Sequence, residues 1–197
     1  MFTGIYQSAA ILATAIAYYV MDFRLIHRFD SLRASGTSRA WDYTVMAVIG
    51  GSVVVIQPLA LPWLGVHTDA WWGMLIQGVG IALTVAGLAL ARWARIHLAQ
   101  FFGERVEFQP GQYLIDTGPY TYVRHPIYSS FFMIAVGLLL INPSLTTLLV
   151  AIYIFADFIH ITPGEEKLLA EKIPGYAEYV TRTGRFFPRL GRSPTGE

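Results

Sequence analysis

Long apolar stretches limit what this chain can fold into more than any other feature of its sequence. Three of them, residues 4–21, 43–66 and 71–90, each approach the roughly 20 residues that a helix needs to cross about 30 Å of hydrocarbon. Charged residues make up only 14% of the 197 residues, against about 25% in soluble domains. The sequence therefore disfavours a disordered chain, a coiled coil and an ordinary soluble enzyme.

Two shorter apolar runs, residues 127–141 and 145–161, follow and are separated by Asn142-Pro143-Ser144. A proline-containing turn between two apolar helices predicts a tight antiparallel hairpin. The predicted fold class is all-α: an integral membrane bundle of five transmembrane helices with a carboxyl-terminal helical hairpin and cytoplasmic tail helices. Small residues inside the spans are expected to allow close helix packing, namely Gly50, Gly51, Gly78 and Gly80.

The positions of the cations support five spans. All 14 Lys and Arg residues fall in the segments that follow the first, third and fifth apolar stretches. The positive-inside rule then places the amino terminus outside and the carboxyl terminus in the cytoplasm, across a bacterial plasma membrane or the endoplasmic reticulum. No Lys or Arg precedes Arg24, which favours a membrane helix over a cleaved signal peptide. Arg92 and Arg95 are expected to be interfacial anchors.

Several kinds of site are disfavoured by composition. The chain has no cysteine, which excludes disulfides, thiolate metal sites and cysteine nucleophiles. The net charge of +1 gives no basic surplus for nucleic acid. The five histidines are scattered, so we expect no metal site. Asp157 and His160 share one helix face at the end of the fifth stretch; they either bond to each other or face a substrate.

Polar and aromatic residues collect where the fourth apolar helix begins. Proline suits the first position of a helix, so Pro126 is predicted to start it. Arg124 and His125 then lie beside a helix amino terminus, whose unpaired N–H groups suit an anionic ligand group. An ordinary polar helix entry and a ligand site explain this cluster equally well.

A second polar cluster follows the fifth stretch. Thr162-Pro163-Gly164-Glu165 fits a capping box, with Thr162 as the N-cap. Glu165 is therefore either a capping residue, an acceptor for ligand hydroxyls, or both, whereas Glu166 is expected to point elsewhere and be solvated. Further along, Gly184 fits a helix C-cap. Arg185 and the two phenylalanines after it are expected to anchor the tail at the membrane surface.

In these segments the chain resembles the isoprenylcysteine carboxyl methyltransferase family and its prokaryotic membrane relatives, from about residue 112 to residue 188. The motifs that carry the resemblance occur in the family's order. They are Gly118-Pro119-Tyr120, Arg124-His125-Pro126-Ile127-Tyr128, Glu165-Glu166 before Leu168-Leu169, and Gly184-Arg185-Phe186-Phe187-Pro188.

The resemblance implies a methyltransferase that uses S-adenosylmethionine without a Rossmann domain, at the cytoplasmic membrane face. A lipophilic small-molecule, prenylated or lipid acceptor would enter from the bilayer. Residues 1–95 would form a three-helix scaffold and residues 96–197 the cofactor-binding region of a single domain, 1–197. The implied cofactor-binding residues are Gln112, Tyr113, Leu114, Ile115, Tyr120, His125, Pro126, Ile127, Tyr128 and Glu165.

The chain departs from the family pattern at the acceptor side. Ile161 stands where the family usually has a substrate-facing arginine four residues before the pocket glutamate, with His160 next to it. Asp157 and His160 are the remaining substrate-facing candidates, and no catalytic residue is assigned. An NADPH-dependent sterol or steroid reductase with a related Arg-His-Pro element is the alternative enzyme class, and a membrane scaffold the non-enzymatic alternative.

Overall fold

A computed structural model of the chain describes residues 1–29, 41–68, 70–101 and 111–189. Within these ranges the chain is helical and has no β-strand, which confirms the all-α prediction. Four of the cations, Arg33, Arg39, Arg105 and Arg192, lie outside the described residues. The elements are α1 (Ile5–Phe29), α2 (Trp41–Ala60), η2 (Pro62–Leu64), α3 (Trp71–Leu98), η3 (Ala99–Phe101), η4 (Gly118–Thr121), α4 (Pro126–Ile141), α5 (Leu145–Lys172) and α6 (Tyr176–Arg182).

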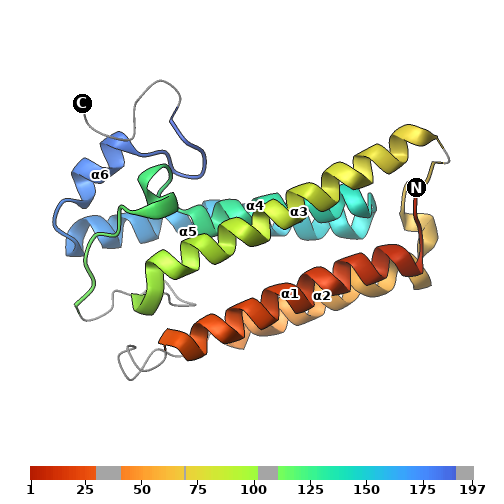
Figure 1. The fold of residues 1–197 in the computed structure, drawn as a ribbon, viewed down its shortest axis with the longest axis horizontal. Helices are drawn as coiled ribbons and strands as arrows, with labels where there is room; N and C mark the ends of the chain where they lie inside the picture. The colour runs from red at the N-terminus through yellow and green to blue at the C-terminus, as the bar shows by residue number, and fades with distance from the viewer. Residues whose placement is uncertain (30–40, 69, 102–110, 190–197) are drawn as a thin grey trace.

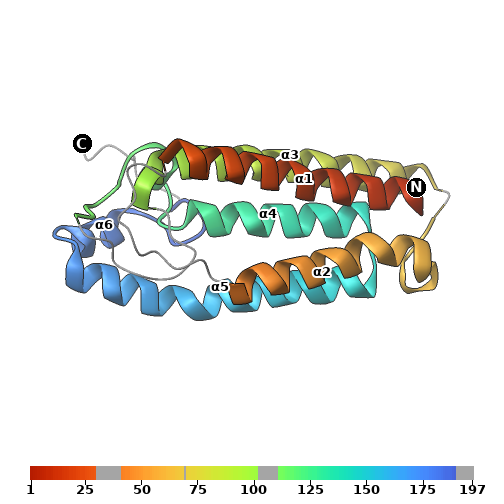
Figure 2. The ribbon, with the colours of Figure 1, turned by 90° about the horizontal axis from the view of Figure 1, so that it is seen from below.

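The five long helices run alternately up and down in two layers (Figures 1 and 2). One layer holds α1 and α2; the other holds α3, α4 and α5, with α4 in the middle. The last residues of α1, α3 and α5 and the first residues of α4 meet at the end of the bundle where α6 lies, which we call the polar end. The described lysines and arginines belong to these helix ends and to the tail, as the one-sided charge pattern predicts.

Length and composition identify the membrane helices. The helices α1, α3 and α5 are long and apolar enough to span a bilayer, with mean hydropathies of 1.5, 2.0 and 1.8. The segments Gly50–Ala60 of α2 and Pro126–Ile141 are shorter apolar helices. The chain is therefore a multi-pass helical membrane protein, and the crossing of all five helices stays a prediction.

The hairpin between α4 and α5 forms as its sequence predicts. Pro126 occupies the first turn of α4, and His125 precedes it as the N-cap. Ser144 caps α5 because its hydroxyl accepts a hydrogen bond from the backbone N–H of Thr147 at 3.2 Å. Asn142, fully buried in the turn, donates to Gln57 of α2 at 2.8 Å. The turn thereby joins the two layers.

The predicted helix start at Thr162 is wrong. Helix α5 continues through Pro163 to Lys172, and the Thr162 hydroxyl donates to the carbonyl of Phe158 one turn earlier. Such back-bonding is the usual behaviour of threonine inside a helix. Glu165 is therefore not part of a capping box and is held on a continuous helix.

Close contact between α3 and α4 depends on glycine. A Cβ on Gly137 would lie 2.3 Å from the Thr84 Oγ1 and 2.7 Å from the Gly80 carbonyl oxygen, so the two backbones leave no room for a side chain. This confirms the packing role of Gly80. The same prediction is wrong for Gly51 and Gly78, where an added Cβ would have no atom within 4 Å.

A buried ion pair joins α1 to α3 near the polar end. The Nη2 of Arg95 lies 2.5 Å from the Oδ1 of Asp22, and the Arg95 side chain is only 3% exposed. The anchor prediction is thus wrong for Arg95, because the rotation of α3 turns this residue toward α1. Arg92, which precedes it on the same helix, is exposed as an anchor would be.

We expect Gly137→Ala to destabilise the protein by about 1–3 kcal/mol, because the added methyl must push the two helices apart. Gly78→Ala is the matched control in the same helix pair: it meets open space and removes a helix-interior glycine, so it should be neutral or stabilising. Thermal unfolding of both variants in the same detergent measures the difference. Equal melting temperatures would show that the α3–α4 contact is looser than described.

Candidate cofactor site

A pocket lies at the polar end, between the end of α3, the start of α4, α5 and the tail. All ten residues that the resemblance implies for cofactor binding line it, although they come from four separate stretches of the chain, 112–115, 120, 125–128 and 165. The remaining lining residues are Leu98, Phe101, Arg124, Leu168, Leu169, Ile173, Tyr176 and Tyr179.

Glu165 forms the acidic side of the pocket. The hydroxyl of Tyr128 donates to its Oε2 at 2.8 Å, and the Nδ1 of His125 lies 3.6 Å from the same oxygen. The rings of His125 and Tyr128 are stacked nearly parallel with centroids 5.3 Å apart. The carboxylate is thus held in one direction by two stacked side chains at the start of α4 and still lines the pocket as a hydrogen-bond acceptor.

Glu166 is not solvated, contrary to the sequence interpretation. Its Oε1 accepts hydrogen bonds from the Nε of Arg124 at 2.8 Å and from the Nε2 of His125 at 3.3 Å. The Nη2 of Arg185 lies 2.5 Å from its Oε2. This bond also raises the pKa of the Arg185 guanidinium, which stays charged. One carboxylate, 12% exposed, therefore gathers side chains from two distant segments.

The tail is paired along its backbone with the entry to α4. The N–H groups of Arg124 and His125 donate to the carbonyls of Gly184 and Arg185 at 2.8 and 3.1 Å, and Gly184 N–H donates back to Tyr122. A Cβ on Gly184 would lie 1.7 Å from the carbonyl oxygen of Phe187. Gly184 is therefore required for close approach of the backbone. The C-cap of α6 is Thr183, so the predicted C-cap role of Gly184 is wrong.

The tail residues predicted as anchors divide into two kinds. Arg185 turns inward to Glu166, and the Phe186 ring packs against His125 at 5.9 Å and Phe132 at 5.2 Å between ring centroids. Phe187 is 71% exposed, as an anchor would be.

Apolar and phenolic side chains form the other walls. Tyr120 and Ile127 pack with Ala94 of α3, and Ile173, Tyr176 and Tyr179 form a second cluster against Leu114. Burial raises the pKa of all three tyrosines, Tyr120, Tyr176 and Tyr179, so they remain neutral phenols. The Tyr179 hydroxyl donates to the Tyr120 carbonyl at 2.6 Å, which joins α6 to η4.

The two substrate-facing candidates lie apart from this pocket. His160 is exposed and Asp157 half-buried on α5, and neither is among the pocket's lining residues. Ile161 is likewise half-buried and does not line it. Among the described residues, no group of His, Cys, Asp and Glu side chains is arranged to hold a metal ion.

Sequence reasoning missed some of the residues that form the site. The sequence places Arg124 at a helix entry or ligand site, but its partners were missed: it donates to Glu166 and to the carbonyls of Val180 and Thr183. Tyr176 and Tyr179 resemble ordinary tail residues in the sequence. Their spacing of three, which puts both on one face of a short helix, is the sequence feature that could have predicted their burial.

The fold and the site define the class of this protein: a multi-pass helical membrane protein with a pocket at the polar end of the bundle. Residues 80–171 match the model of the isoprenylcysteine carboxyl methyltransferase (ICMT) family. The chain belongs to this family of membrane methyltransferases, as its motifs indicated.

Curated relatives support this membership. The chain is 31% identical over 157 residues to the cobalt-zinc-cadmium resistance protein CzcN of Cupriavidus metallidurans, covering 79% of this chain and 71% of that protein. It is 28% identical to the nickel-cobalt-cadmium resistance protein NccN of Alcaligenes xylosoxydans xylosoxydans, over 70% of this chain and 62% of that protein. It is 24% identical to protein-S-isoprenylcysteine O-methyltransferase B of Arabidopsis thaliana, over 91% and 92% of the two chains.

A solved structure shares the fold. The eukaryotic intramembrane Ras methyltransferase ICMT superposes with a TM-score of 0.56 at 24% identity. The match covers 78% of this chain and 54% of that one, so this chain spans about half the length of that enzyme.

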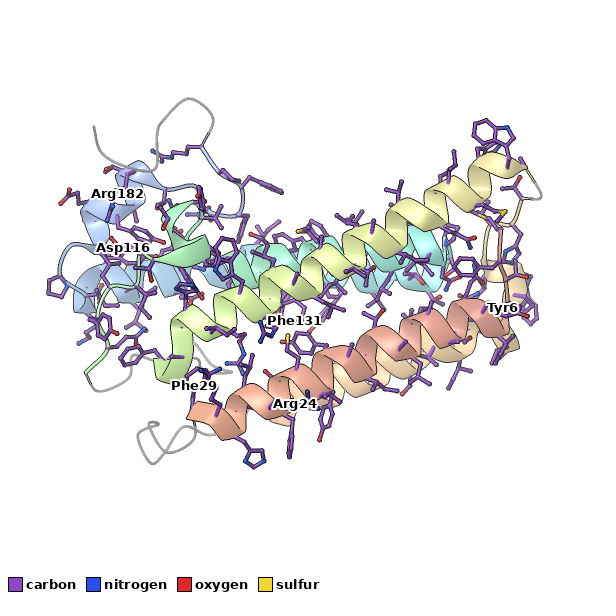
Figure 3. All side chains as sticks on the ribbon, viewed as in Figure 1. Tyr6, Arg24, Phe29, Asp116, Phe131 and Arg182 are labelled. Atoms are coloured by element: carbon purple, nitrogen blue, oxygen red, sulfur yellow. The ribbon has the colours of Figure 1, made fainter. Side chains whose placement is uncertain are left out.

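The network around Glu166 should dominate the stability of the tail. We expect Glu166→Gln to cost about 3–5 kcal/mol, because it leaves the buried Arg124 without its countercharge. Asp116→Asn is the matched control, since it breaks the exposed pair with Arg182 at the same end of the molecule (Figure 3) and should cost less than about 1 kcal/mol. Thermal unfolding, with hydrogen exchange of residues 183–189, measures both; similar losses in the two variants would contradict the hub role of Glu166.

Proposed function

We propose that the chain is an S-adenosylmethionine-dependent methyltransferase that acts on a lipophilic acceptor drawn from the bilayer. The observation that carries the proposal is the convergence of the ten motif residues on one pocket, from segments up to 53 positions apart in the sequence between Gln112 and Glu165. Family membership supplies the reaction class, and the pocket's chemistry supports the cofactor.

The side chains that line the pocket fit the polar groups of the cofactor. Glu165 is a carboxylate acceptor fixed by Tyr128 and suits the ribose hydroxyls, because charge-assisted hydrogen bonds are the strong ones. His125 and the start of α4 suit the methionine carboxylate. The aromatic rings of Tyr120 and Tyr128 suit the adenine or the sulfonium cation. When bound, the cofactor supplies an electrophilic methyl group on sulfur.

The residues of the chain act by positioning and by excluding water. In-line displacement needs the acceptor atom aligned behind the methyl group, and most of the catalytic gain comes from that alignment. Stacked His125 and Tyr128 rigidify the acidic side, while the Tyr176–Tyr179 cluster closes the tail side with neutral, apolar surface. An acceptor that is already anionic, such as a carboxylate or a thiolate, releases no proton on methylation and needs no proton acceptor on the protein.

The acceptor is proposed to be a prenylated or other lipophilic molecule. The pocket lies at the end of membrane helices. The apolar chain of an acceptor can therefore remain in the hydrocarbon while the polar end of the acceptor reaches the pocket, which is why we propose a lipophilic class. Two relatives are named for metal resistance and one for isoprenylcysteine methylation, so the names leave sulfur, oxygen and nitrogen acceptors open.

The membrane orientation is part of the proposal. The described cations lie at the polar end, so the positive-inside rule places this end and the cofactor pocket in the cytoplasm. The division into a scaffold, residues 1–95, and a binding region, residues 96–197, agrees with a pocket lined from Leu98 onward.

Calorimetric binding of S-adenosylhomocysteine to the detergent-purified protein tests the cofactor assignment. We expect saturable binding that Glu165→Gln weakens by about 10- to 100-fold, the value of a charged hydrogen bond. His160→Ala is the control on the same helix, since it is exposed and outside the pocket. Unchanged binding in Glu165→Gln would refute the role of this carboxylate, and binding of NADPH in place of S-adenosylhomocysteine would establish the reductase class.

Transfer of a labelled methyl group tests the acceptor class. Incubation of the protein with methyl-labelled S-adenosylmethionine and either a membrane lipid extract or a prenylcysteine analogue should place label in the organic phase. Glu165→Gln at subsaturating cofactor should reduce this label in proportion to its weakened binding. Label confined to water-soluble products would refute a lipophilic acceptor.

A further inference from the structure

Helix α4 has one face that no other described helix covers. It lies in the middle of the layer formed by α3, α4 and α5, and the layer of α1 and α2 covers one side only (Figures 1 and 2). Its sixteen residues include no charged side chain, and apolar residues occupy every side of the helix. A helix of this kind requires apolar surroundings on its far face as well.

A groove of about 400 Å³ lies on this face near the polar end. Trp93 of α3 and Met133 and Val136 of α4 line it, and Phe186 and Phe187 of the tail close it. The Ser129 hydroxyl in its wall already donates to the carbonyls of His125 and Phe186. The groove therefore favours a hydrocarbon occupant.

The groove does not belong to the cofactor pocket. The pocket is lined by Tyr120, His125 and Tyr128, whereas the groove is lined by Pro119, Val123 and Ser129 of the same segments. The start of α4 thus separates the two cavities. A molecule in the groove is on the wrong side of α4 to meet a methyl group in the pocket.

Features at the groove's polar end fit a phospholipid. Trp93 and Tyr122 line it and are 45% and 47% exposed, as aromatic residues at the membrane–water interface are. Arg189 directly follows the lining residue Pro188 and is exposed, and its guanidinium donates to the carbonyl of Thr181 on α6. In the other direction, Leu83 of α3 extends the apolar lining along the helix, away from the polar end.

We propose that this groove binds one acyl chain of a membrane phospholipid, with its headgroup at the level of Trp93 and Tyr122. The bound chain packs against Phe186, whose ring contacts His125 and whose carbonyl is held by Ser129 at 2.6 Å. The lipid thereby holds the segment from Arg185 to Pro188 against α4. Lipid tails are as apolar as leucine, so the preference of a lipid for the groove over the rest of the protein surface arises from packing and is moderate.

Quenching of Trp93 by lipids brominated on their acyl chains tests the site. A variant keeps Trp93 and replaces Trp41, Trp63, Trp71 and Trp72 by Phe, and it is reconstituted in phosphatidylcholine vesicles with increasing brominated fraction. We expect a brominated lipid to occupy the groove about three- to tenfold more readily than the general lipid surface. Val136→Phe, which fills the groove, should remove this excess; Ile152→Phe, on the exposed face of α5 outside the groove, should not.

A second measurement, amide hydrogen exchange, reports how firmly the tail is held and shows whether each variant is folded. In the same vesicles, Val136→Phe and the groove-opening Phe187→Ala should each speed hydrogen exchange of the Arg124, His125 and Gly184 amides several-fold, while Ile152→Phe leaves them unchanged. The proposal would be overturned if Trp93 quenching in every variant matched that expected for the general lipid surface, and if the tail amides exchanged at the same rate in all of them. Protection of Trp93 from all brominated lipid together with a dimeric protein would assign the groove to a second copy. Displacement of the lipid by an isoprenoid alcohol alone would also overturn the proposal, because the groove would then take an isoprenoid chain in place of a phospholipid.

Discussion

The carboxylate of Glu166 is the interaction on which the polar end depends. Three segments far apart in the sequence meet at it: α5 itself, the entry to α4 through Arg124 and His125, and the tail through Arg185. Arg124 is 6% exposed, so its charge is satisfied by Glu166 and by the carbonyls of Val180 and Thr183. Buried pairs of this kind add little net stability relative to apolar packing, but they are costly to break from one side. The network thus specifies one arrangement of the three segments.

Two adjacent glutamates have different roles because they lie on a helix. Successive residues point about 100° apart, so Glu165 faces the pocket while Glu166 faces the tail. This division of roles requires α5 to continue as a helix through Pro163. Within that helix the hydroxyl of Thr162 donates to the carbonyl of Phe158, one turn earlier. His125 lies between the two carboxylates, with Nδ1 toward Glu165 and Nε2 toward Glu166. The His125 ring therefore links the network around Glu166 to the Glu165 side of the pocket.

Local pattern was sufficient to predict the long helices, whereas the residues that line the pocket were predicted from the resemblance to the family. In hydrocarbon the backbone N–H and C=O groups can form hydrogen bonds only with each other, so apolar stretches of the right length form helices. Pro126 and Ser144 mark where two of these helices begin. The partners of Glu166, Arg95 and Gly184 were not predictable, because each depends on the rotation of one element relative to another distant in sequence. Hydropathy determines that a helix exists, whereas its rotation is set by contacts such as Gly80 against Gly137. The prediction at Thr162 fails for a different reason: the residues of a capping box are also compatible with a helix interior.

The contact between α3 and α4 explains why the site lies where it does. Glycines at the centre of the pair bring the backbones together, and near the polar end larger residues, Tyr120 and Ile127 against Ala94, replace them. The helices are thus close in the membrane, while Leu98 and Tyr120 line a pocket where α3 ends and η4 crosses to α4. The Arg95–Asp22 pair holds α1 against this same part of α3. The pocket at the polar end is therefore a consequence of helix packing: tight glycine contacts between α3 and α4, bulky side chains where α3 ends and α4 begins, and a tail held against the entry to α4 by one carboxylate.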